Sequence, residues 1–299
     1  MKVSVIIPTY NGAHKILNVL KCLEVQSYKD FEVIVIIDGS TDGTEELLRS
    51  GNLKINNLKI IEQSNQGRSV VRNNGATAAE GDLLIFFDDD MIVSTDCIYS
   101  HLKFHENNKN SVLVGRVRHN IENPNCTDFD KYRYYLEKKW FANFKTGISR
   151  ITLSNYVFTT QNLSIPKQIF TDINGFDNQL TDSEDFDLSM RLFKNDIKIF
   201  YNYDSLAYHN DIISIEKYIK RQKEYLLSKQ KLLRIHPLYK NMHPDSFTEN
   251  TSVFKKNLLL PLRYNKIIKH IITSKYFLNY LPLSFRYKFY TYVIFASNS

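Results

Sequence analysis

Short apolar runs alternate with amphipathic helical patterns over roughly the first hundred residues of the chain. The runs carry Val, Ile, Leu or Phe on both of their alternating faces, which is what a strand buried on both sides of a parallel sheet requires. Helical segments between such strands are typical of βαβ units. The pattern predicts four strands, at Val3–Pro8, Phe31–Ile37, Leu58–Ile61 and Leu83–Phe87.

Three helices are expected between these strands. They begin near Ala13, near Asp42 and near Gly67, and Asp42 with Glu45 has the spacing of a capping box. The predicted fold class is therefore α/β, with a mixed, mostly parallel sheet flanked by helices.

The regular alternation ends after Gly115. An aromatic, polar stretch over 132–144 and an irregular segment over 146–160 indicate an insertion over a cleft. Sheet-like residues from Lys198 continue to His209, and charged helical patterns follow over 213–234 and after residue 253. We therefore expect an α/β domain over 1–212 and a basic, aromatic, C-terminal helical region over 213–299.

The formal net charge of +7 is distributed unevenly along the chain. From residue 213 onward there are 16 Lys and Arg against 4 Asp and Glu, whereas the preceding part holds 23 against 28. A basic, aromatic tail over 253–299 favours peripheral contact with an anionic membrane surface. Packing on the α/β domain and a homo-oligomer interface are the alternatives, and nucleic acid is a weaker candidate.

Cysteine usage and hydropathy bear on the compartment. Cys22, Cys97 and Cys126 are an odd number without metal-ligand spacing, which favours free thiols in a reducing compartment. The apolar run after Met1 is too short for a signal sequence, and no run reaches the roughly 20 apolar residues that span a bilayer. We expect a cytoplasmic protein that is peripheral at the inner face of the membrane.

Polar residues stand at the carboxyl ends of the predicted strands, where open parallel sheets bind ligands. Three of these ends should converge on one side of the sheet. Their residues are Pro8-Thr9-Tyr10-Asn11 after the first strand, Asp38-Gly39-Ser40 after the second, and Asp88-Asp89-Asp90 after the fourth.

The acidic triplet 88–90 is the strongest of these signals. Three adjacent carboxylates at the rim of an apolar core repel one another unless a cation neutralises them. Mn²⁺ or Mg²⁺ would bind such carboxylates together with phosphate oxygens and stabilise a departing diphosphate. A solvated acidic loop or a helix cap is the alternative, and the position at a strand end favours the metal.

Other side chains near the strand ends are candidates for nucleotide binding. Asp38 can accept hydrogen bonds from a base or a ribose, and Tyr10 can stack on a base. Gly67 and Arg68, at a helix start, can face phosphates. Arg72 can do the same, or can pair with an aspartate of the triplet. Ordinary turns and a capped surface helix are the alternatives for these positions.

A second acidic cluster, over 182–187, lies at the start of a helical pattern. Acidic residues are common there because they complement the helix dipole. Asp185 is also a candidate general base that takes a proton from a hydroxyl nucleophile. His209 can complete a metal site begun by Asp90, although a lone histidine is more often a packed residue.

In their order along the chain, these motifs resemble those of the family 2 glycosyltransferases with the GT-A fold. The likeness covers roughly the first 210 residues, and each motif is weak alone whereas the ordered set is specific. The matching motifs are Pro8-Thr9-Tyr10-Asn11-Gly12, Asp38-Gly39-Ser40-Thr41-Asp42-Gly43-Thr44, Gln66-Gly67 with Arg72-Asn73, Phe87-Asp88-Asp89-Asp90, Gly175-Phe176-Asp177 and Glu184-Asp185-Phe186-Asp187-Leu188.

The resemblance implies a GT-A catalytic domain over 1–212 and a nucleotide diphosphate sugar as donor, with UDP as its carrier. An inverting transfer would follow, in which a base deprotonates a hydroxyl of a saccharide or lipid-linked acceptor in surface polysaccharide or glycolipid assembly. The aromatic stretch over 132–144 would line the acceptor cleft. The implied residues are Thr9, Tyr10, Asp38 and Arg68 for the nucleotide, Asp88 and Asp90 as the Asp-x-Asp motif, His209 for the metal and Asp185 as the base.

Two other functions stay open. A sugar nucleotidylyltransferase has a similar core but needs a Gly-rich basic loop after the first strand, and residues 11–15 are a poor version of one. A non-catalytic nucleotide-sugar-binding protein would keep the donor site without transfer. Dehydrogenases and serine hydrolases are disfavoured, because the chain lacks Gly-x-Gly-x-x-Gly and Gly-x-Ser-x-Gly.

Overall fold

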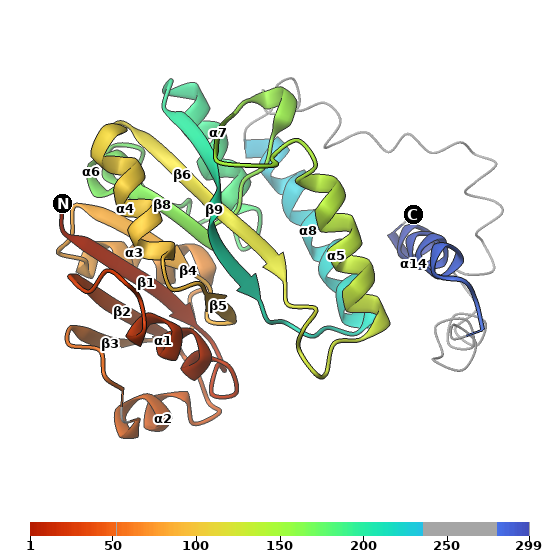
Figure 1. Ribbon diagram of the computed structural model, residues 1–299, viewed down its shortest axis with the longest axis horizontal. Helices are drawn as coiled ribbons and strands as arrows, with labels where there is room; N and C mark the ends of the chain where they lie inside the picture. Colours follow the sequence, from red (N-terminus) through yellow and green to blue (C-terminus); the bar gives the residue numbers. More distant parts are fainter. Residues whose placement is uncertain (52, 236–279, 299) are drawn as a thin grey trace. The chain divides into compact units, whose positions relative to one another are not determined.

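The structure is a computed structural model that describes residues 1–51, 53–235 and 280–298 (Figure 1). Contacts between residues divide the chain into two compact units. The first consists of Met1–Asn123 and Glu137–Asp211, and the second of Pro124–Leu136 and Ile212–Ser299. The domain boundary that we predicted at residue 212 stays a prediction.

The first unit holds a nine-stranded sheet in the order β3-β2-β1-β4-β8-β6-β9-β5, with β7 paired to β9. The strands β3, β2, β1 and β4 pair in parallel, whereas β8 runs antiparallel to both β4 and β6. The strands are β1 (Val3–Thr9), β2 (Phe31–Asp38), β3 (Leu58–Gln63), β4 (Leu83–Phe87), β5 (Met91–Val93), β6 (Ser111–His119), β7 (Ile148–Ile151), β8 (Asn162–Pro166) and β9 (Lys198–His209).

Helices pack on both faces of this sheet, which confirms the predicted fold class. One apolar core joins the sheet to α1 (Ile16–Glu24), α2 (Thr44–Ser50) and α4 (Cys97–Asn107). A second core joins the opposite face to α3 (Arg68–Ala78), α6 (Lys167–Asp172) and α7 (Glu184–Lys194).

The strand β1 shows why the apolar runs predict buried strands. Its residues Val3, Val5 and Ile7 enter one core, and Ile6 enters the other. Because successive side chains point to opposite faces, only a strand that is apolar at nearly every position fits between two layers of helices. All four predicted strands are present, and their ends differ from the prediction by at most two residues.

Two local predictions are wrong. No capping box forms at the start of α2, because Gly43 is the N-cap in a left-handed conformation with φ +81°. Asp42 instead accepts hydrogen bonds from the backbone N–H groups of Ala13 and Thr44. The segment 146–160 is also not irregular throughout, because it contains β7, which pairs with β9.

A buried amide fixes the relation between β6 and β9. The parallel register of these strands shifts between Gly115 and Arg116. The Asn162 amide at the start of β8 donates to the carbonyl oxygens of Arg116 at 3.1 Å and Ser205 at 2.8 Å. A Cβ at position 115 would lie 2.3 Å from Asn162 Nδ2, so glycine is required there.

The carbonyl oxygen of the same Asn162 side chain accepts a hydrogen bond from His101 Nε2 at 2.7 Å. Ser164 Oγ lies 2.7 Å from His101 Nδ1 and 2.8 Å from His105 Nε2. Burial lowers the pKa of His101 to about 4 and the pKa of His105 to about 3. Both imidazoles are therefore neutral hydrogen-bonding groups inside the fold at pH 7.

The second unit is helical where it is described. It contains the first turns of α5 (Asp128–Trp140), together with α8 (Ile215–Ile235) and α14 (Leu283–Asn298). Its apolar core consists of Phe129, Tyr132, Ile215, Ile219, Tyr290 and Val293. The helix predicted over 213–234 is confirmed, whereas the helical pattern predicted over 253–279 lies outside the described residues.

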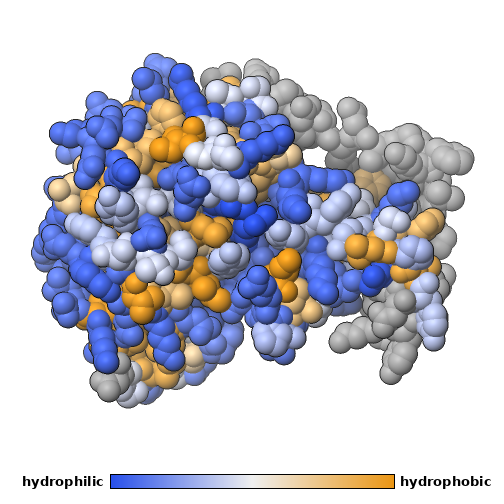
Figure 2. Space-filling model, viewed as in Figure 1, coloured by the Kyte–Doolittle hydropathy of each residue, from blue (hydrophilic) through white to orange (hydrophobic). Residues whose placement is uncertain are grey.

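Surface hydropathy and helix length describe how the molecule meets its surroundings. On the face shown in Figure 2, hydrophilic residues predominate and hydrophobic ones form small separate groups. Within the ranges that the structure describes, no helix combines the length and the hydropathy needed to cross a bilayer.

Candidate active site

Parallel pairing brings the ends of β1, β2 and β4 to one edge of the sheet. The register aligns Thr9 with Ile37 and Ile6 with Phe86, so the segments that follow these strands leave the sheet side by side. The polar residues after the three strands therefore meet where the sequence predicted.

The loop after β1 is held by the loop after β2. The Asn11 backbone N–H donates to Ser40 Oγ at 3.0 Å, and the Thr41 N–H donates to Asn11 Oδ1 at 2.8 Å. The Gly12 N–H donates to Thr44 Oγ1 at 3.0 Å. Asn11 has a φ of +48°, a conformation that Asn tolerates better than most residues. These bonds fix the shape of the edge before any ligand arrives.

Asp38 fixes the start of α3. Its carboxylate accepts hydrogen bonds from Gln63 Nε2 at 2.8 Å and from the backbone N–H groups of Gln66 and Gly67, both at 2.9 Å. A carboxylate has about four acceptor positions, so one position remains for a base or ribose donor. Its predicted nucleotide contact stays a prediction.

Each carboxylate of the acidic triplet has its own partners. Asp88 Oδ1 lies 2.7 Å from Arg72 Nη2. Asp89 Oδ2 accepts from Thr9 Oγ1 at 2.6 Å, and Asp89 Oδ1 lies 2.7 Å from Lys15 Nζ. Asp90 Oδ1 lies 3.3 Å from His209 Nε2, and Asp90 Oδ2 lies 3.7 Å from Lys15 Nζ. The predicted mutual repulsion is thus offset by three different basic side chains.

The two more buried carboxylates of the triplet have opposite pKa shifts. Burial and the charge of Asp90 raise the pKa of Asp89, although Lys15 and Thr9 oppose the shift. Burial also acts against ionisation of Asp90, but His209 and Lys15 outweigh it and hold the pKa of Asp90 below its usual range. Asp90 is therefore the anionic end of this cluster over the whole physiological range.

Arg72 joins the two acidic clusters that the sequence separates by almost one hundred residues. Its guanidinium, 4% exposed, contacts Asp88 at 2.7 Å and Glu184 Oε1 at 2.8 Å. Burial lowers the pKa of Arg72, but the two carboxylates outweigh this and raise it. The predicted alternative in which Arg72 pairs with the triplet is the one that the structure contains.

The predicted base lies in the first turn of α7. The preceding residue, Ser183, is buried and has a φ of +63°, an uncommon conformation for a residue other than glycine. Asp185 is half-buried, and burial together with the charge of Glu184 raises the pKa of Asp185 to about 7. A carboxylate with that pKa is suited to accept and release a proton near neutral pH.

His209 ends β9 and pairs with residues of both neighbouring strands. It is opposite Met91 in β5 and opposite His119 in β6, and the two imidazole rings are 5.5 Å apart. The ladder therefore holds its ring beside Asp90, which agrees with the predicted pairing of these two residues. Its role in metal binding stays a prediction.

A divalent cation has a partial set of ligands at this edge. Within 1–51, 53–235 and 280–298, no group of three or more His, Cys, Asp or Glu side chains is arranged to hold a metal ion. However, Asp90 Oδ1 is buried, has no hydrogen-bond partner among the described residues and faces His209 Nε2. A carboxylate oxygen and an imidazole nitrogen are ligands that Mn²⁺ accepts, so these side chains fit the ion.

The other predicted nucleotide contacts lie around the same edge. Pro8 and Thr9 end β1, and the Tyr10 side chain that follows them is 53% exposed, as a stacking platform needs to be. Gly67 is the N-cap of α3 with φ +88°. Arg68 is exposed, with Nη1 3.7 Å from Asp182 Oδ1. Their contacts with a nucleotide stay predictions.

Lys15 and Glu184 belong to the site and were not assigned to it from the sequence. Lys15 contacts both Asp89 and Asp90, and Glu184 is the second anion on Arg72. Lys15 stands four residues after a polar strand end, and Glu184 precedes the predicted base. These sequence positions suggested that both residues lie near the site, but they did not indicate which side chains Lys15 and Glu184 contact.

The aromatic stretch predicted to line an acceptor cleft is divided between the two units. Tyr132 is buried in the core of the second unit. Phe141 and Phe144 line a cavity of the first unit. The prediction for this stretch is untested as a whole.

Several known proteins resemble this chain. The chain is 40% identical over 116 residues to the uncharacterized glycosyltransferase YfnE of Bacillus subtilis, which is 38% of the chain and 30% of that relative. S. aureus TarS 1–349 in complex with UDP has a similar fold, with a TM-score of 0.58 and 20% identity, covering all of the chain and 91% of that protein. The mannosyltransferase PcManGT of Pyrobaculum calidifontis, in complex with GDP-Man and Mn²⁺, gives a TM-score of 0.63 and 15% identity, with 99% of the chain and 86% of that protein covered.

These likenesses agree with the GT-A fold that the motifs implied. The chain spans less than two thirds of the length of the first curated relatives that it matches. The model of the family described as glycosyl transferase family 2 matches residues 4–174, more than half of the chain. The chain therefore belongs to glycosyl transferase family 2.

Proposed function

We propose that the chain is an inverting glycosyltransferase that moves a sugar from a nucleotide diphosphate, with UDP as the preferred carrier, to a hydroxyl of a saccharide or lipid-linked acceptor. The observation that carries the proposal is the position of Asp88, Asp89 and Asp90 at the edge where the loops after β1 and β2 are bound to each other. Surface polysaccharide or glycolipid assembly is the proposed setting. The family membership and the UDP in the TarS structure support the donor class.

The metal would be held by Asp88, Asp90 and His209. When bound, Mn²⁺ or Mg²⁺ supplies positive charge that offsets the charge developing on the leaving diphosphate. Asp90 supplies a carboxylate that remains ionised, because His209 and Lys15 keep its pKa low. Arg72 orients the Asp88 carboxylate through a 2.7 Å contact, and Thr9 and Lys15 hold Asp89.

Asp185 would act as the base. Its carboxylate takes the proton of the acceptor hydroxyl, and that oxygen attacks the anomeric carbon on the face opposite the leaving diphosphate. A single carboxylate suffices for inversion in one displacement. Because the pKa of Asp185 is raised to about 7, its active, deprotonated form increases as pH rises through neutrality.

The test uses the full chain, Mn²⁺ and a panel of nucleotide sugars, with nucleotide release as the readout. We expect release that EDTA abolishes and that falls at least a hundredfold in Asp90→Asn. In Asp185→Asn, transfer should fall by a similar factor while donor binding, measured by calorimetry, is retained. The rate of wild-type transfer should rise with pH to a plateau above about pH 7.

The competing functions give different results in the same experiment. Release of pyrophosphate from a nucleoside triphosphate would indicate a nucleotidylyltransferase. Donor binding without transfer, unchanged in Asp185→Asn, would indicate a non-catalytic nucleotide-sugar-binding protein. Full transfer in the presence of EDTA would contradict the metal-dependent mechanism.

We also propose peripheral contact of the tail, 253–299, with an anionic membrane. Residues 253–279 lie outside the described residues. In α14, Tyr290 and Val293 are buried in the second unit, whereas Phe285 is 59% exposed and Lys288 lies near its ring. Co-sedimentation with phosphatidylglycerol vesicles, but not with phosphatidylcholine vesicles, would support this contact. A concentration-dependent dimer without vesicle binding would instead favour the oligomer interface.

A further inference from the structure

A cavity of about 320 Å³ lies in the first unit, and none of the residues that line it belongs to the loops around the acidic triplet. Three segments line it, namely 116–118 of β6, residues between 137 and 145 at the end of α5 and beyond, and Tyr201 with Tyr203 of β9. Its volume is at the lower end of the range of small-molecule sites, which is about 300–1,000 Å³. It is large enough for one sugar ring and a charged substituent.

The charged side chains of the cavity are mostly cationic. Four are basic, Arg116, Arg118, Lys138 and Lys145, and one is acidic, Glu137. The carboxylate of Glu137 accepts a hydrogen bond from the backbone N–H of His119 at 2.7 Å. Burial raises the pKa of Glu137 to about 7, so near neutral pH this carboxyl is only about half ionised and offsets part of one of the four positive charges. The lining therefore favours an anion.

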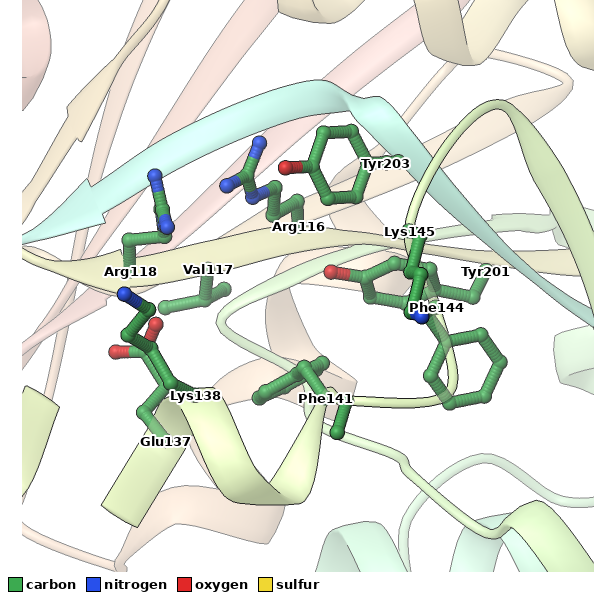
Figure 3. A pocket seen from close by; sticks show the side chains of 11 residues that line it. Arg116, Val117, Arg118, Glu137, Lys138, Phe141, Phe144, Lys145, Tyr201 and Tyr203 are labelled. Atoms are coloured by element: carbon green, nitrogen blue, oxygen red, sulfur yellow. The ribbon is translucent and has the colours of Figure 1, made fainter. Parts of the chain in front are cut away.

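Aromatic rings form the remaining wall. Tyr201 contacts Phe144, with ring centroids 4.7 Å apart, and Phe141, at 5.5 Å. Figure 3 shows Arg118, Lys138 and Glu137 at one end of the cavity and Phe144 and Tyr201 at the other. A ligand with one charged end and one apolar face matches this division, and sugar rings have apolar faces that pack on aromatic rings.

Arg116 lies between the two ends. Its guanidinium carbon is 3.6 Å from the centre of the Tyr203 ring, a stacked arrangement that keeps the plane of the group fixed. A planar guanidinium binds phosphate through two parallel N–H donors, a geometry that an ammonium group lacks. A carboxylate matches the same pair of donors, but a phosphate monoester carries a charge of about −1.5 to −2 and so better matches a lining with four basic side chains and one acidic one.

The same two strands connect the cavity to the acidic triplet. Arg118 is opposite Tyr208 in the ladder, and the next pair is His119 with His209. His209 in turn faces Asp90 Oδ1 at 3.3 Å. Consecutive side chains of a strand point to opposite faces, so Arg118 and His119 are one backbone position apart, about 3.3 Å, but face opposite sides of the sheet. On the side of the cavity, Tyr201 and Phe144 share a core with Leu188 and Leu192 of α7, the helix that carries the proposed base Asp185.

We propose that this cavity is the acceptor subsite and that it binds a phosphate-bearing saccharide or polyol, with the phosphate on Arg116 and Arg118 and the ring on the aromatic wall. This inference rests on the proposed function, since an acceptor subsite belongs to a transferase. It assigns a chemical class to the acceptor, which neither the family nor the motifs define.

The test measures binding to the full chain by calorimetry, with glucose 6-phosphate, methyl glucoside and inorganic phosphate as probes. We expect glucose 6-phosphate to bind at least tenfold more tightly than either of the other two. In the double variant Arg116→Ala/Lys145→Ala this affinity should fall at least tenfold. The matched control, Lys109→Ala/Arg150→Ala, removes one exposed lysine and one exposed arginine outside the cavity and should bind as the wild type does.

Binding of UDP in the presence of Mn²⁺ distinguishes a failure of the proposed glycosyltransferase function from a failure of the proposed acceptor subsite. The double variant should bind UDP as tightly as the wild type, which also shows that it is folded. The inference is overturned if the double variant keeps both UDP and glucose 6-phosphate affinity, or if methyl glucoside or inorganic phosphate binds the wild type equally well. If the wild type binds glucose 6-phosphate but no nucleotide, the proposed function is contradicted, whereas binding of a sugar phosphate in the cavity is supported.

A competition experiment with lipid vesicles tests whether the phosphate of the acceptor belongs to a lipid or to a soluble or polymeric molecule. Phosphatidylglycerol vesicles that bind the wild type and compete with glucose 6-phosphate would support a lipid-linked phosphate. Binding of glucose 6-phosphate that is unaffected by these vesicles would support a soluble or polymeric one.

Discussion

The loops around the acidic triplet and the cavity beside β6 are held in different ways. In the loops, side chains and backbone N–H groups are bound to each other by short hydrogen bonds, such as those of Asp38 and Asn11. In the cavity, the cations stand on β6, on α5 and on the segment after α5, and Arg116 is held by stacking on Tyr203 of β9. The first region is held by hydrogen bonds between the loops that follow different strands, whereas the second depends on the register between β6 and β9.

This difference predicts how each region responds to substitution. Removal of one partner in the loops leaves a buried polar group unsatisfied, which lowers the free energy of unfolding as well as ligand binding. Removal of one cation from the cavity should weaken anion binding with little effect on stability, because the cavity is open to solvent. The predictions for Arg72, Gly12 and Tyr203 test this contrast, and the prediction for two buried histidines tests the fold that carries both regions. They are given from the largest expected effect to the smallest.

Arg72→Met should lower the free energy of unfolding by about 3–5 kcal/mol, because it leaves the buried Glu184 carboxylate without its cation and Asp88 without its orienting partner. Urea unfolding measures the change. The control is Arg68→Ala, which removes an exposed arginine from the same helix and should change stability by less than about 0.5 kcal/mol. Equal midpoints for the two variants would contradict the bridging role of Arg72.

The free energy of unfolding should fall as pH drops from about 6.5 toward 4, because His101 and His105 are neutral in the fold and take up protons on unfolding. The slope for each histidine is about 1.4 kcal/mol per pH unit, or about 2 kcal/mol between pH 6.5 and pH 5. This stability is fully present above the unfolded pKa and is lost as pH falls toward the folded one.

Urea unfolding at several pH values tests this dependence. His101→Gln/His105→Gln should flatten the curve in this window, whatever its effect on absolute stability. His14→Gln, which replaces an exposed histidine, should leave the slope unchanged. A double variant with the wild-type slope would show that these two groups do not control acid unfolding.

Gly12→Ala should weaken UDP binding at least tenfold and lower the free energy of unfolding by about 1–3 kcal/mol. The added Cβ would lie 2.1 Å from Thr9 Oγ1 and 2.8 Å from Asp89 Oδ2, so the Thr9–Asp89 hydrogen bond has to open. Gly147→Ala is the comparison, because its φ of +59° strains the backbone without disturbing the triplet. UDP affinity that falls equally in both variants would contradict the prediction.

Tyr203→Leu should weaken glucose 6-phosphate binding about two- to fivefold, equivalent to about 0.5–1 kcal/mol for a solvent-accessible cation–π contact, with stability nearly unchanged. Tyr99→Leu removes the ring beside Lys103 in α4 and should have no effect on this binding. Calorimetry on both variants measures the difference. If Tyr99→Leu weakened glucose 6-phosphate binding as much as Tyr203→Leu or more, the stacking of Tyr203 on Arg116 would not be what supports this binding.

The part of the fold that sequence predicts well is the part determined by local pattern. Strands such as β1 are apolar on both faces, and the residues that end them are polar, so both the parallel sheet and its binding edge follow from short windows of sequence. The positions of Asp88–Asp90, Asp38 and Thr9 at this edge agree with the structure for that reason.

The contacts that sequence did not predict join distant positions. Glu184 pairs with Arg72 across 112 residues, and nothing in either segment specifies the other. The capping box at Asp42 does not form because Gly43 takes the N-cap position, and the Asp42 carboxylate instead accepts from the Thr44 N–H through one oxygen and from the distant Ala13 N–H through the other. The basic lining of the cavity was missed, although aromatic residues of 132–144 were expected at an acceptor cleft, because Arg116 and Arg118 look like ordinary strand positions until β9 and the end of α5 are placed beside them.

Asn162 has a consequence for the electrostatic potential of the molecule. Its amide bonds to the carbonyl oxygen of Arg116 and excludes any Cβ at Gly115, so β6 cannot slide along its neighbours. A slip by one residue would turn every side chain of the strand to the opposite face of the sheet and remove both arginines from the cavity. An uncharged side chain thus determines on which face of the sheet the positive potential appears.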